Sequence, residues 1–417
     1  MDRLRTTIRR YDWGSPTALP ELLGVAPDGT PQAELWMGAH PAAPSLVERG
    51  GHLRPLDAVV ASDPAGELGA AAVRRFGPRL PFLLKLLAAD APLSLQVHPD
   101  AAQAAAGYAR EDAAGIPLDA PHRTYRDAHH KPEMIVALSP FEGLCGFRPA
   151  RECARLLDAL EVAGLAPYAE VLRSRPEADA LREVFSAFLA SPAPDLVARV
   201  ARALARGAGS GGEWARDRAV YAGVARAHPG DPGLLAALLV RPVRLAPGEA
   251  LFLGPGVPHA YLRGLGVEVM AGSDNVLRCG LTAKHVDVAE LLRIVRFAPG
   301  RAGAVRPEVL PGGEELYRAP VDDFRLSRLR PGAARAAYRL DGSGPQVLVC
   351  TGGRARLAGR RGELALRAGE SAYAPAGEEV AVTGSGTVFR ATVGREAARR
   401  ESVPTGCRPP RQQLNSH

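Results

Sequence analysis

The chain has 417 residues, of which 46% are hydrophobic and 23% charged, the proportions of an ordinary globular protein rather than a fibrous or disordered one. Its formal net charge is +7, but the arginines are scattered among carboxylates and only 5% of the residues are aromatic, which excludes a base-stacking surface for nucleic acid. No apolar run reaches the length of a membrane helix. We therefore expect two or three domains, no nucleic acid and no membrane as partners, and at most a modest attraction for anionic metabolites.

Strand patterns come first along the chain. Short apolar runs at residues 81–87 and 92–98 are separated by a turn at residues 90–92. Residues 150–236 differ, because apolar side chains recur there at helical spacing, as at Leu181, Val184 and Phe185. Within that segment, the small residues of 207–212 predict a flexible loop between two helices.

Strand patterns return after Leu238 and continue to the C-terminal third. From about residue 318 to 393, short β-like runs are split by glycine pairs, which is typical of a small all-β barrel or sandwich. Residues 395–417 are rich in Arg, Pro and Gln, and we expect them to form a disordered tail.

An internal repeat connects the two β-rich regions. Residues 247–259 align without gaps to residues 368–380, and both copies have Gly-Glu, then a strand, then a glycine-centred turn. The pattern resembles the second motif of cupin barrels, whose metal-ligand position is His259 in the first copy and Val380 in the second.

The repeat implies a mainly β fold with two cupin-type jelly-roll barrels related by duplication and an inserted α-helical domain. Only the first barrel would hold a metal. The expected units are part of the metal-binding barrel (1–149), the helical domain (150–236), the rest of that barrel with a following helix (237–317), a metal-free barrel (318–394) and the tail (395–417).

The rarest basic residue indicates where chemistry is concentrated. Only three of the 52 lysine and arginine residues are lysines, namely Lys85, Lys131 and Lys284. Arginine stays charged in proteins, whereas burial can lower the pKa of a lysine until it acts as an acid or base. Lysines that persist in so arginine-rich a chain therefore mark candidate functional positions.

Candidate metal ligands lie in three blocks of sequence. Gln96 and His98 are two residues apart on a predicted strand and project to one face. Pro132 forces an extended backbone near Glu133, and His259 ends the first repeat copy. Two imidazoles, a carboxylate and an amide oxygen form a set suited to a divalent ion such as Zn²⁺, although each residue alone is more often structural.

Together the blocks resemble type I phosphomannose isomerases. The resemblance covers most of residues 1–300 and is carried by residues 11–15 (YDWGS), 34–41 (ELWMGAHP), 93–99, 130–133 and 268–284. It implies one Zn²⁺ per chain, held by Gln96, His98, Glu133 and His259, an active-site arginine at Arg278, and a sugar phosphate as substrate. Two positions depart from the family pattern, His129 before His-Lys-Pro-Glu and Ala283 before Lys284, and they concern only local loop geometry.

An aldose–ketose isomerase moves a proton between C1 and C2 through an enediolate, which needs charge stabilisation and a base. The candidates for the base are Lys131, Lys85, His130 and Glu268, and the sequence does not choose among them. We expect Arg278 near the reacting oxygens. The expected phosphate-binding residues are Lys85, Ser94 and Lys284, and Tyr261 lines either the pocket or the core.

Alternatives remain open at this stage. Lys284 could pair with Asp287 at the start of a helix, and the chain could be a non-catalytic cupin or an isomerase of another aldose. The five cysteines are odd in number, lack CxxC spacing and follow no signal peptide, so we expect a reducing cytoplasm. We also expect a monomer.

Overall fold

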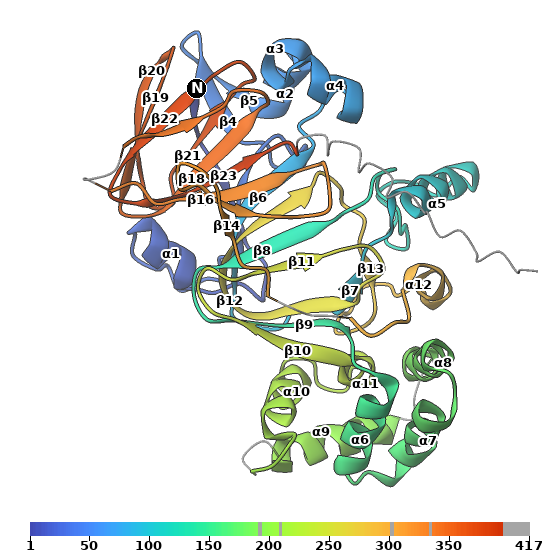
Figure 1. The fold of residues 1–417 in the computed structure, drawn as a ribbon. Helices are drawn as coiled ribbons and strands as arrows, with labels where there is room; N and C mark the ends of the chain where they lie inside the picture. The colour runs from blue at the N-terminus through green and yellow to red at the C-terminus, as the bar shows by residue number, and fades with distance from the viewer. Residues whose placement is uncertain (191–193, 208–210, 301–303, 333–335, 395–417) are drawn as a thin grey trace, which may run out of the picture.

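The computed structural model describes residues 1–190, 194–207, 211–300, 304–332 and 336–394. It is mainly β-sheet with helices at its periphery, which confirms the predicted class (Figure 1). The predicted disordered tail, and residues 208–210 of the predicted loop, lie outside the described residues.

The first sheet has ten strands among the described residues, and every strand pairing in it is antiparallel. Its strands are β2 (Thr7–Arg9), β3 (Glu34–Met37), β6 (Phe82–Ala89), β7 (Gln96–Val97), β8 (Glu133–Ala137), β9 (Phe141–Phe147), β10 (Val240–Leu245), β11 (Ala250–Leu253), β12 (His259–Ala271) and β13 (Leu277–Arg278). The long strand β12 connects the sheet, because its first part pairs with β7 and β9 and its second part pairs with β6 and β8. Segments far apart in the sequence therefore meet along β12.

The C-terminal part contains a seven-stranded and a four-stranded sheet. The larger one is formed by β1 (Asp2–Leu4), β14 (Glu308–Val309), β15 (Glu315–Tyr317), β16 (Arg325–Leu329), β18 (Gln346–Gly352), β21 (Ser371–Ala374) and β23 (Thr387–Thr392). The smaller one is formed by β17 (Tyr338–Leu340), β19 (Arg354–Gly359), β20 (Gly362–Arg367) and β22 (Val380–Gly384). Apolar residues such as Leu348, Leu357 and Val382 form the core shared by these strands.

The N-terminal strand differs from the expected division of the chain. Strand β1 pairs with β21 and so belongs to the C-terminal sheet, although residues 1–149 were expected to form part of the first unit. A separate hairpin of β4 (Leu46–Arg49) and β5 (His52–Pro55) follows the first strands.

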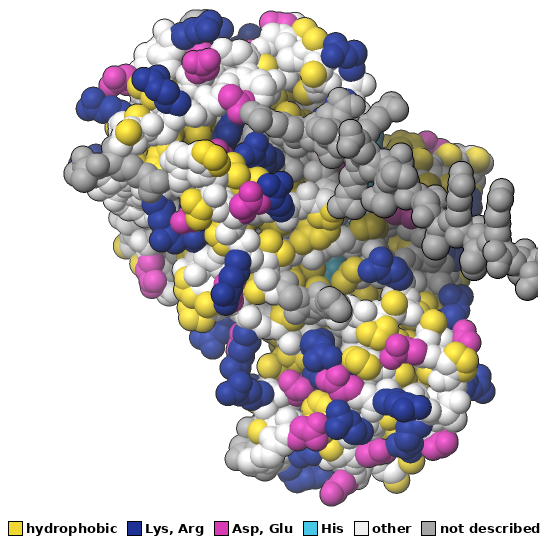
Figure 2. Space-filling model, viewed as in Figure 1, with side chains coloured by type: hydrophobic (Ala, Val, Ile, Leu, Met, Phe, Trp, Pro, Cys, Tyr) yellow, Lys and Arg dark blue, Asp and Glu magenta, His cyan; other side chains and the backbone are white. Residues whose placement is uncertain are grey.

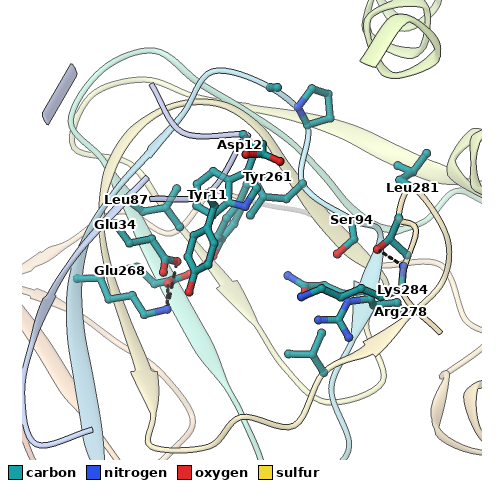
Figure 3. A pocket seen from close by; sticks show the side chains of 18 of the residues that line it. Tyr11, Asp12, Glu34, Leu87, Ser94, Tyr261, Glu268, Arg278, Leu281 and Lys284 are labelled. Carbon is teal, nitrogen blue, oxygen red and sulfur yellow. Dashed lines mark hydrogen bonds and ion pairs between the residues drawn. The ribbon is translucent and has the colours of Figure 1, made fainter. Parts of the chain in front are cut away.

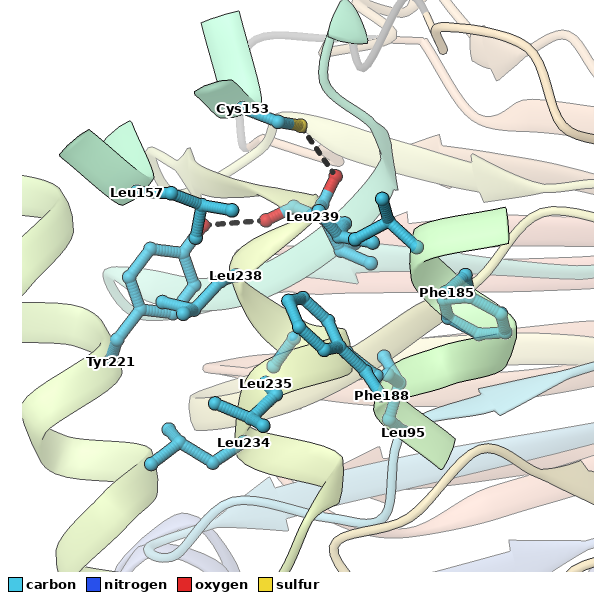
Figure 4. Packing of buried hydrophobic residues seen from close by; sticks show 14 of the residues in the cluster. Leu95, Cys153, Leu157, Phe185, Phe188, Tyr221, Leu234, Leu235, Leu238 and Leu239 are labelled. Carbon is cyan, nitrogen blue, oxygen red and sulfur yellow. Dashed lines mark hydrogen bonds between the residues drawn. The ribbon is translucent and has the colours of Figure 1, made fainter. Parts of the chain in front are cut away.

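A run of helices comes between β9 and β10, as the periodicity of residues 150–236 predicted. They are α6 (Ala150–Ala159), the 3₁₀ turn η1 (Ala163–Leu165), α7 (Ala166–Ser174), α8 (Glu177–Leu189), α9 (Pro194–Gly207), α10 (Ala215–Ala227) and α11 (Gly233–Leu238). They gather at one end of the molecule (Figure 1). Their apolar faces share one core with Leu95 and Val97 beside the candidate ligands, and Phe188 and Leu235 lie in that core (Figure 4).

Shorter helices fill the periphery: α1 (Ala18–Leu23), α2 (Leu56–Ser62), α3 (Pro64–Leu68), α4 (Ala70–Phe76), α5 (Ala101–Ala113) and α12 (Val288–Ile294). Helix α5 starts with a capping box in which the Asp100 side chain accepts from the Gln103 backbone N–H and the Gln103 side chain accepts from that of Asp100. This cap fixes the chain two residues after His98. Among the described helices, none has the length and apolarity needed to cross a membrane.

Candidate functional site

Three buried side chains from distant parts of the chain converge on one point. His98 follows β7, Glu133 begins β8 and His259 begins β12. The His98 Nε2 atom lies 3.4 Å from Glu133 Oε1, and the His259 Nε2 atom lies 3.7 Å from Glu133 Oε2. Their ligand atoms all lie within 4.8 Å of one another, which is the arrangement of a metal-binding cluster.

The tautomer of both imidazoles is set by backbone carbonyls. His98 Nδ1 lies 2.8 Å from the Asn275 carbonyl oxygen, and His259 Nδ1 lies 2.9 Å from that of Val257. Because a carbonyl oxygen only accepts hydrogen bonds, each Nδ1 carries the proton and each Nε2 offers a lone pair. Both Nε2 atoms are buried and have no hydrogen-bond partner among the described residues, as expected for atoms that bind an ion.

Burial favours the neutral form of the His98 ring. It lowers the pKa of His98 from 6.5 to about 4, despite the neighbouring Glu133 carboxylate. The imidazole is therefore unprotonated at neutral pH, which is the form that binds metals.

Gln96 lies beside the cluster. Its backbone is paired with that of His259 on one side and that of Arg278 on the other, and it lines the adjoining cavity. The structure thus brings Gln96 together with the three buried residues named as ligands.

A cavity of about 870 Å³ opens next to this cluster, and its two sides differ in charge. Figure 3 shows Glu34 and Glu268 on one side, and Ser94, Arg278 and Lys284 on the other. A ligand with an anionic end would therefore have one preferred orientation in the cavity.

The acidic side surrounds a buried lysine. Lys85 Nζ lies 3.1 Å from Glu268 Oε2 and 3.4 Å from Glu34 Oε1, because Lys85 and Glu268 are register partners on β6 and β12. Burial alone would lower the pKa of Lys85, but the surrounding carboxylates outweigh it and raise the pKa. The Tyr261 hydroxyl donates to Glu268 Oε1 at 2.8 Å, so Tyr261 is both buried and part of the cavity wall.

Burial also acts on the carboxyl group of Glu268. It raises the pKa of Glu268, although the charge of Lys85 opposes the shift. The pKa values of two other cavity carboxylates, Glu133 and Asp274, are lowered instead, so the protonated form is favoured at Glu268 and disfavoured at those two residues.

The opposite side of the cavity is cationic. Neither Arg278 nor Lys284 forms a salt bridge with any described residue. The neighbouring charge of Arg278 lowers the pKa of Lys284, with burial as the second cause. Lys284 does not pair with Asp287, whose side chain instead caps α12 by accepting from the Glu290 backbone N–H at 3.0 Å. Arg278 and Lys284 thus face the cavity without an ion-pair partner in the part of the chain that the structure describes.

Two adjacent candidate bases point in different directions. Lys131 lines the cavity, with Nζ 3.1 Å from Glu133 Oε1. His130 is not part of the cavity lining, and its Nε2 instead lies 2.9 Å from Asp323 Oδ2. Neighbouring residues of an extended chain face opposite sides, so only one of the pair reaches the cavity.

Some residues that line the cavity were not predicted from the sequence to have a catalytic, phosphate-binding or metal-binding role. Glu34 accepts from Trp36 Nε1 at 2.8 Å, and the His40 ring lies 3.2 Å from Asp274 Oδ1 through its Nε2. All four line the cavity. Glu34, Trp36 and His40 lie within the block 34–41 that carried the family resemblance, which was the available signal.

Comparisons with known proteins agree with this geometry. Residues 1–150 match the family model of the phosphomannose isomerase type I catalytic domain. The chain is 40% identical to mannose-6-phosphate isomerase of Escherichia coli K12 over 399 residues, covering 94% of this chain and 99% of the relative. It is 39% identical to the Salmonella typhimurium enzyme of that name, covering 93% of this chain and 97% of the relative.

Solved structures give the same result. A variant of phosphomannose isomerase from Salmonella typhimurium superposes with a TM-score of 0.87 at 38% identity, covering 95% of this chain and all of the other. A zinc-bound mannose 6-phosphate isomerase superposes with a TM-score of 0.86 at 37% identity, covering 94% and 99% of the two chains. The chain therefore belongs to the type I phosphomannose isomerase family.

Proposed function

We propose that this protein is a zinc-dependent mannose-6-phosphate isomerase that interconverts mannose 6-phosphate and fructose 6-phosphate. The observation that carries the proposal is the cavity that joins a buried His98–Glu133–His259 cluster to an acidic side and a cationic side. Relatives with this name cover nearly the whole chain, which supports the assignment.

The residues present fit a zinc ion. The unpartnered Nε2 atoms of His98 and His259, the Glu133 carboxylate and the adjoining Gln96 would hold it. When bound, zinc supplies Lewis-acid stabilisation of oxygen charge on the substrate. The solved structures that describe zinc-bound relatives support this choice of metal.

We propose that the cationic side binds the phosphate. Arg278 and Lys284 face the cavity without carboxylate partners, and Ser94 lies beside them (Figure 3). A guanidinium can bind phosphate oxygens through two parallel hydrogen bonds, and an ammonium adds a point charge. Lys85 is not suited to this role, because its partners Glu34 and Glu268 would repel a phosphate. Figure 3 shows these two carboxylates on the side of the cavity opposite Arg278.

We propose Glu268 as the group that carries the proton between C1 and C2. A group that both takes up and releases the proton works best when its pKa is near neutral pH. Burial raises the pKa of Glu268 above its ordinary value and so brings it closer to neutrality. Tyr261 and Lys85 hold the carboxylate in position from two sides. Lys131 then contributes by holding Glu133, and His130 lies outside the set because it contacts Asp323.

We also propose that the fold arose by duplication of a cupin-type barrel. Residues 247–259 and 368–380 each contain a short strand, β11 or β21, that ends before a turn, and the next strand begins at His259 or Val380. Matching glycines have positive φ in both copies: Gly248 and Gly369 at 91° and 82°, and Gly256 and Gly377 at 73° and 82°. The helical insertion at 150–236 and the other domain limits are part of this proposal.

A cytoplasmic location is a further part of the proposal. The four described cysteines are unpaired and buried, which supports a reducing compartment. The monomeric state stays a prediction.

A coupled assay tests the central proposal. Zinc-loaded protein should convert mannose 6-phosphate to fructose 6-phosphate, lose turnover on chelation and regain it with added zinc. Unphosphorylated mannose serves as the control substrate and should react far more slowly, because it lacks the group that the cationic side binds. Metal-loaded protein that leaves mannose 6-phosphate unchanged would refute the assignment.

A further inference from the structure

Asn275 lies in the loop between β12 and β13 and is fully buried. Asparagine is very rare in this chain, where the only other one is Asn415. A buried amide without partners costs on the order of 1–3 kcal/mol, so its contacts indicate why it is there.

The Asn275 side chain binds mainly the backbone of the distant loop 126–129, with one longer contact from Nδ2 to Asp127 Oδ1 at 3.4 Å. Its Oδ1 accepts from the N–H groups of Arg126 and Asp127 at 2.7 and 3.3 Å. Its Nδ2 donates to the carbonyls of Asp127 and His129 at 2.7 and 2.8 Å. An amide offers two acceptor positions and two donors, and these bonds use all four.

The backbone of the same residue contacts a candidate metal ligand. The Asn275 carbonyl accepts from His98 Nδ1 at 2.8 Å. The loop clamped by its side chain leads within a few residues to Lys131 and Glu133. A single residue thus connects the segments that carry two of the three clustered ligand side chains.

We propose that Asn275 is a positioning residue for the metal centre. Its amide fixes the loop that delivers Glu133, and its carbonyl fixes the His98 ring with Nε2 towards the ion. This proposal rests on the proposed function, because it assumes that the cluster binds zinc. It adds a positioning role for Asn275, whose side chain is not one of the candidate ligands. Groups of this kind orient the ligand and raise its basicity.

The contacts explain why asparagine is needed here. Aspartate has the same shape but no donor, so its carboxylate would face the carbonyls of Asp127 and His129. Glutamine would displace the amide by one methylene in a fully buried site. The proposal therefore predicts a specific loss with the near-isosteric change.

The test measures zinc binding without turnover. Metal-free Asn275→Asp is titrated with zinc against a chromophoric chelator, and its affinity should fall by about 10- to 100-fold. Asn275→Ala removes the same bonds without adding a charge, so it should show the same loss even if the aspartate variant does not fold.

Glu111→Gln is the matched control. Glu111 accepts from the N–H groups of Thr124 and Tyr125 at 3.0 and 2.8 Å, just before loop 126–129, and pairs with Arg123. Among the described residues it has no hydrogen bond or ion pair with Asn275 or the cluster. This variant should lower the melting temperature and leave zinc affinity unchanged. If Asn275 had a purely structural role, all three variants would have a lower melting temperature and an unchanged zinc affinity.

Cobalt substitution adds a spectroscopic readout. The visible spectrum of the Co²⁺-loaded protein depends on ligand geometry, so it should change in the Asn275 variants and not in Glu111→Gln. Unchanged zinc affinity and an unchanged cobalt spectrum in both Asn275 variants would overturn the proposal. A wild-type protein that binds zinc but does not isomerise mannose 6-phosphate would overturn the proposed function alone.

Discussion

At the scale of single residues, Lys85 and Lys284 show how neighbouring charges shift the pKa of the same type of side chain in opposite directions. Lys85 lies between Glu34 and Glu268, which raise its pKa and favour its protonated form, so we propose that it orients carboxylates rather than accepting a proton. Lys284 has Arg278 as its charged neighbour, so an incoming anion would relieve a repulsion. The charges around the two lysines come from other strands and loops, and they favour the different roles that we propose for Lys85 and Lys284.

Replacing Lys284 with methionine tests the phosphate site. The loss of one charged hydrogen bond, worth about 1.5–3 kcal/mol, should raise KM for mannose 6-phosphate by about tenfold or more. Lys284→Arg keeps the charge and is the control, with a smaller expected effect. Steady-state kinetics give both values, and an unchanged KM for the methionine variant would remove Lys284 from the site.

Comparing Glu268→Gln with Lys131→Arg identifies the base. Glutamine cannot take up the proton, so kcat should fall by about 10²- to 10⁴-fold. Arginine keeps the charge beside Glu133, so Lys131→Arg should lose much less. The opposite ranking in single-turnover measurements would assign the proton transfer to Lys131, because arginine cannot act as a base at neutral pH.

At the scale of elements, the helices between β9 and β10 support the strand that carries Gln96. Leu95 and Val97 point into the core formed by α8 and α11, so the backbone beside the candidate ligands is packed against helices (Figure 4). The helices therefore support the strand beside the site. The helical segment also contributes His228 to the lining of the cavity.

Leu235→Ala tests this support. Leu235 is fully buried in that core, so the cavity should cost about 2–5 kcal/mol of unfolding free energy, measured by urea denaturation. The exposed Arg202→Ala on α9 should stay within about 0.5 kcal/mol of the wild type. Equal stabilities of the two variants would contradict the packing described for α11.

At the scale of the whole molecule, the centre exists only when three distant segments are folded together. Residues 98, 133 and 259 belong to strands or loops that meet through β12. Acidic and basic side chains are interspersed over the face of the molecule shown in Figure 2. Because the three candidate ligands meet only in the folded chain, metal binding should be coupled to global stability.

Zinc should stabilise the fold. With free zinc at about 100 times its dissociation constant, the gain is about 2.7 kcal/mol, seen as a higher melting temperature in calorimetry. Glu133→Ala removes one ligand and should abolish most of this shift. A wild-type melting temperature that does not respond to zinc would exclude a folded-state site.

The stability of the metal-free protein should depend on pH through His98. Its folded-state pKa of about 4 lies below the ordinary 6.5, so the unfolded chain binds more protons as the pH falls from 6.5 towards 4. Stability is complete above pH 6.5 and should have fallen by about 2 kcal/mol at pH 5 from this residue. Urea unfolding of His98→Gln at both pH values is the control, and it should show a smaller loss than the wild type.

The sequence alone predicted a mainly β fold and named Gln96, His98, Glu133 and His259 as candidate ligands, of which three cluster in the structure. The helical spacing of Leu181, Val184 and Phe185 depends only on neighbouring residues, and so does the placement of Gln96 and His98 on one strand. The tertiary structure decided what depends on contacts between segments distant in the sequence. It placed β1 in the C-terminal sheet, directed His130 to Asp323, brought Glu34 to Lys85 and clamped Asn275 over residues 126–129. Local patterns predict which way a side chain alternates, but hydrogen bonds and charges between distant segments exist only after the chain has folded.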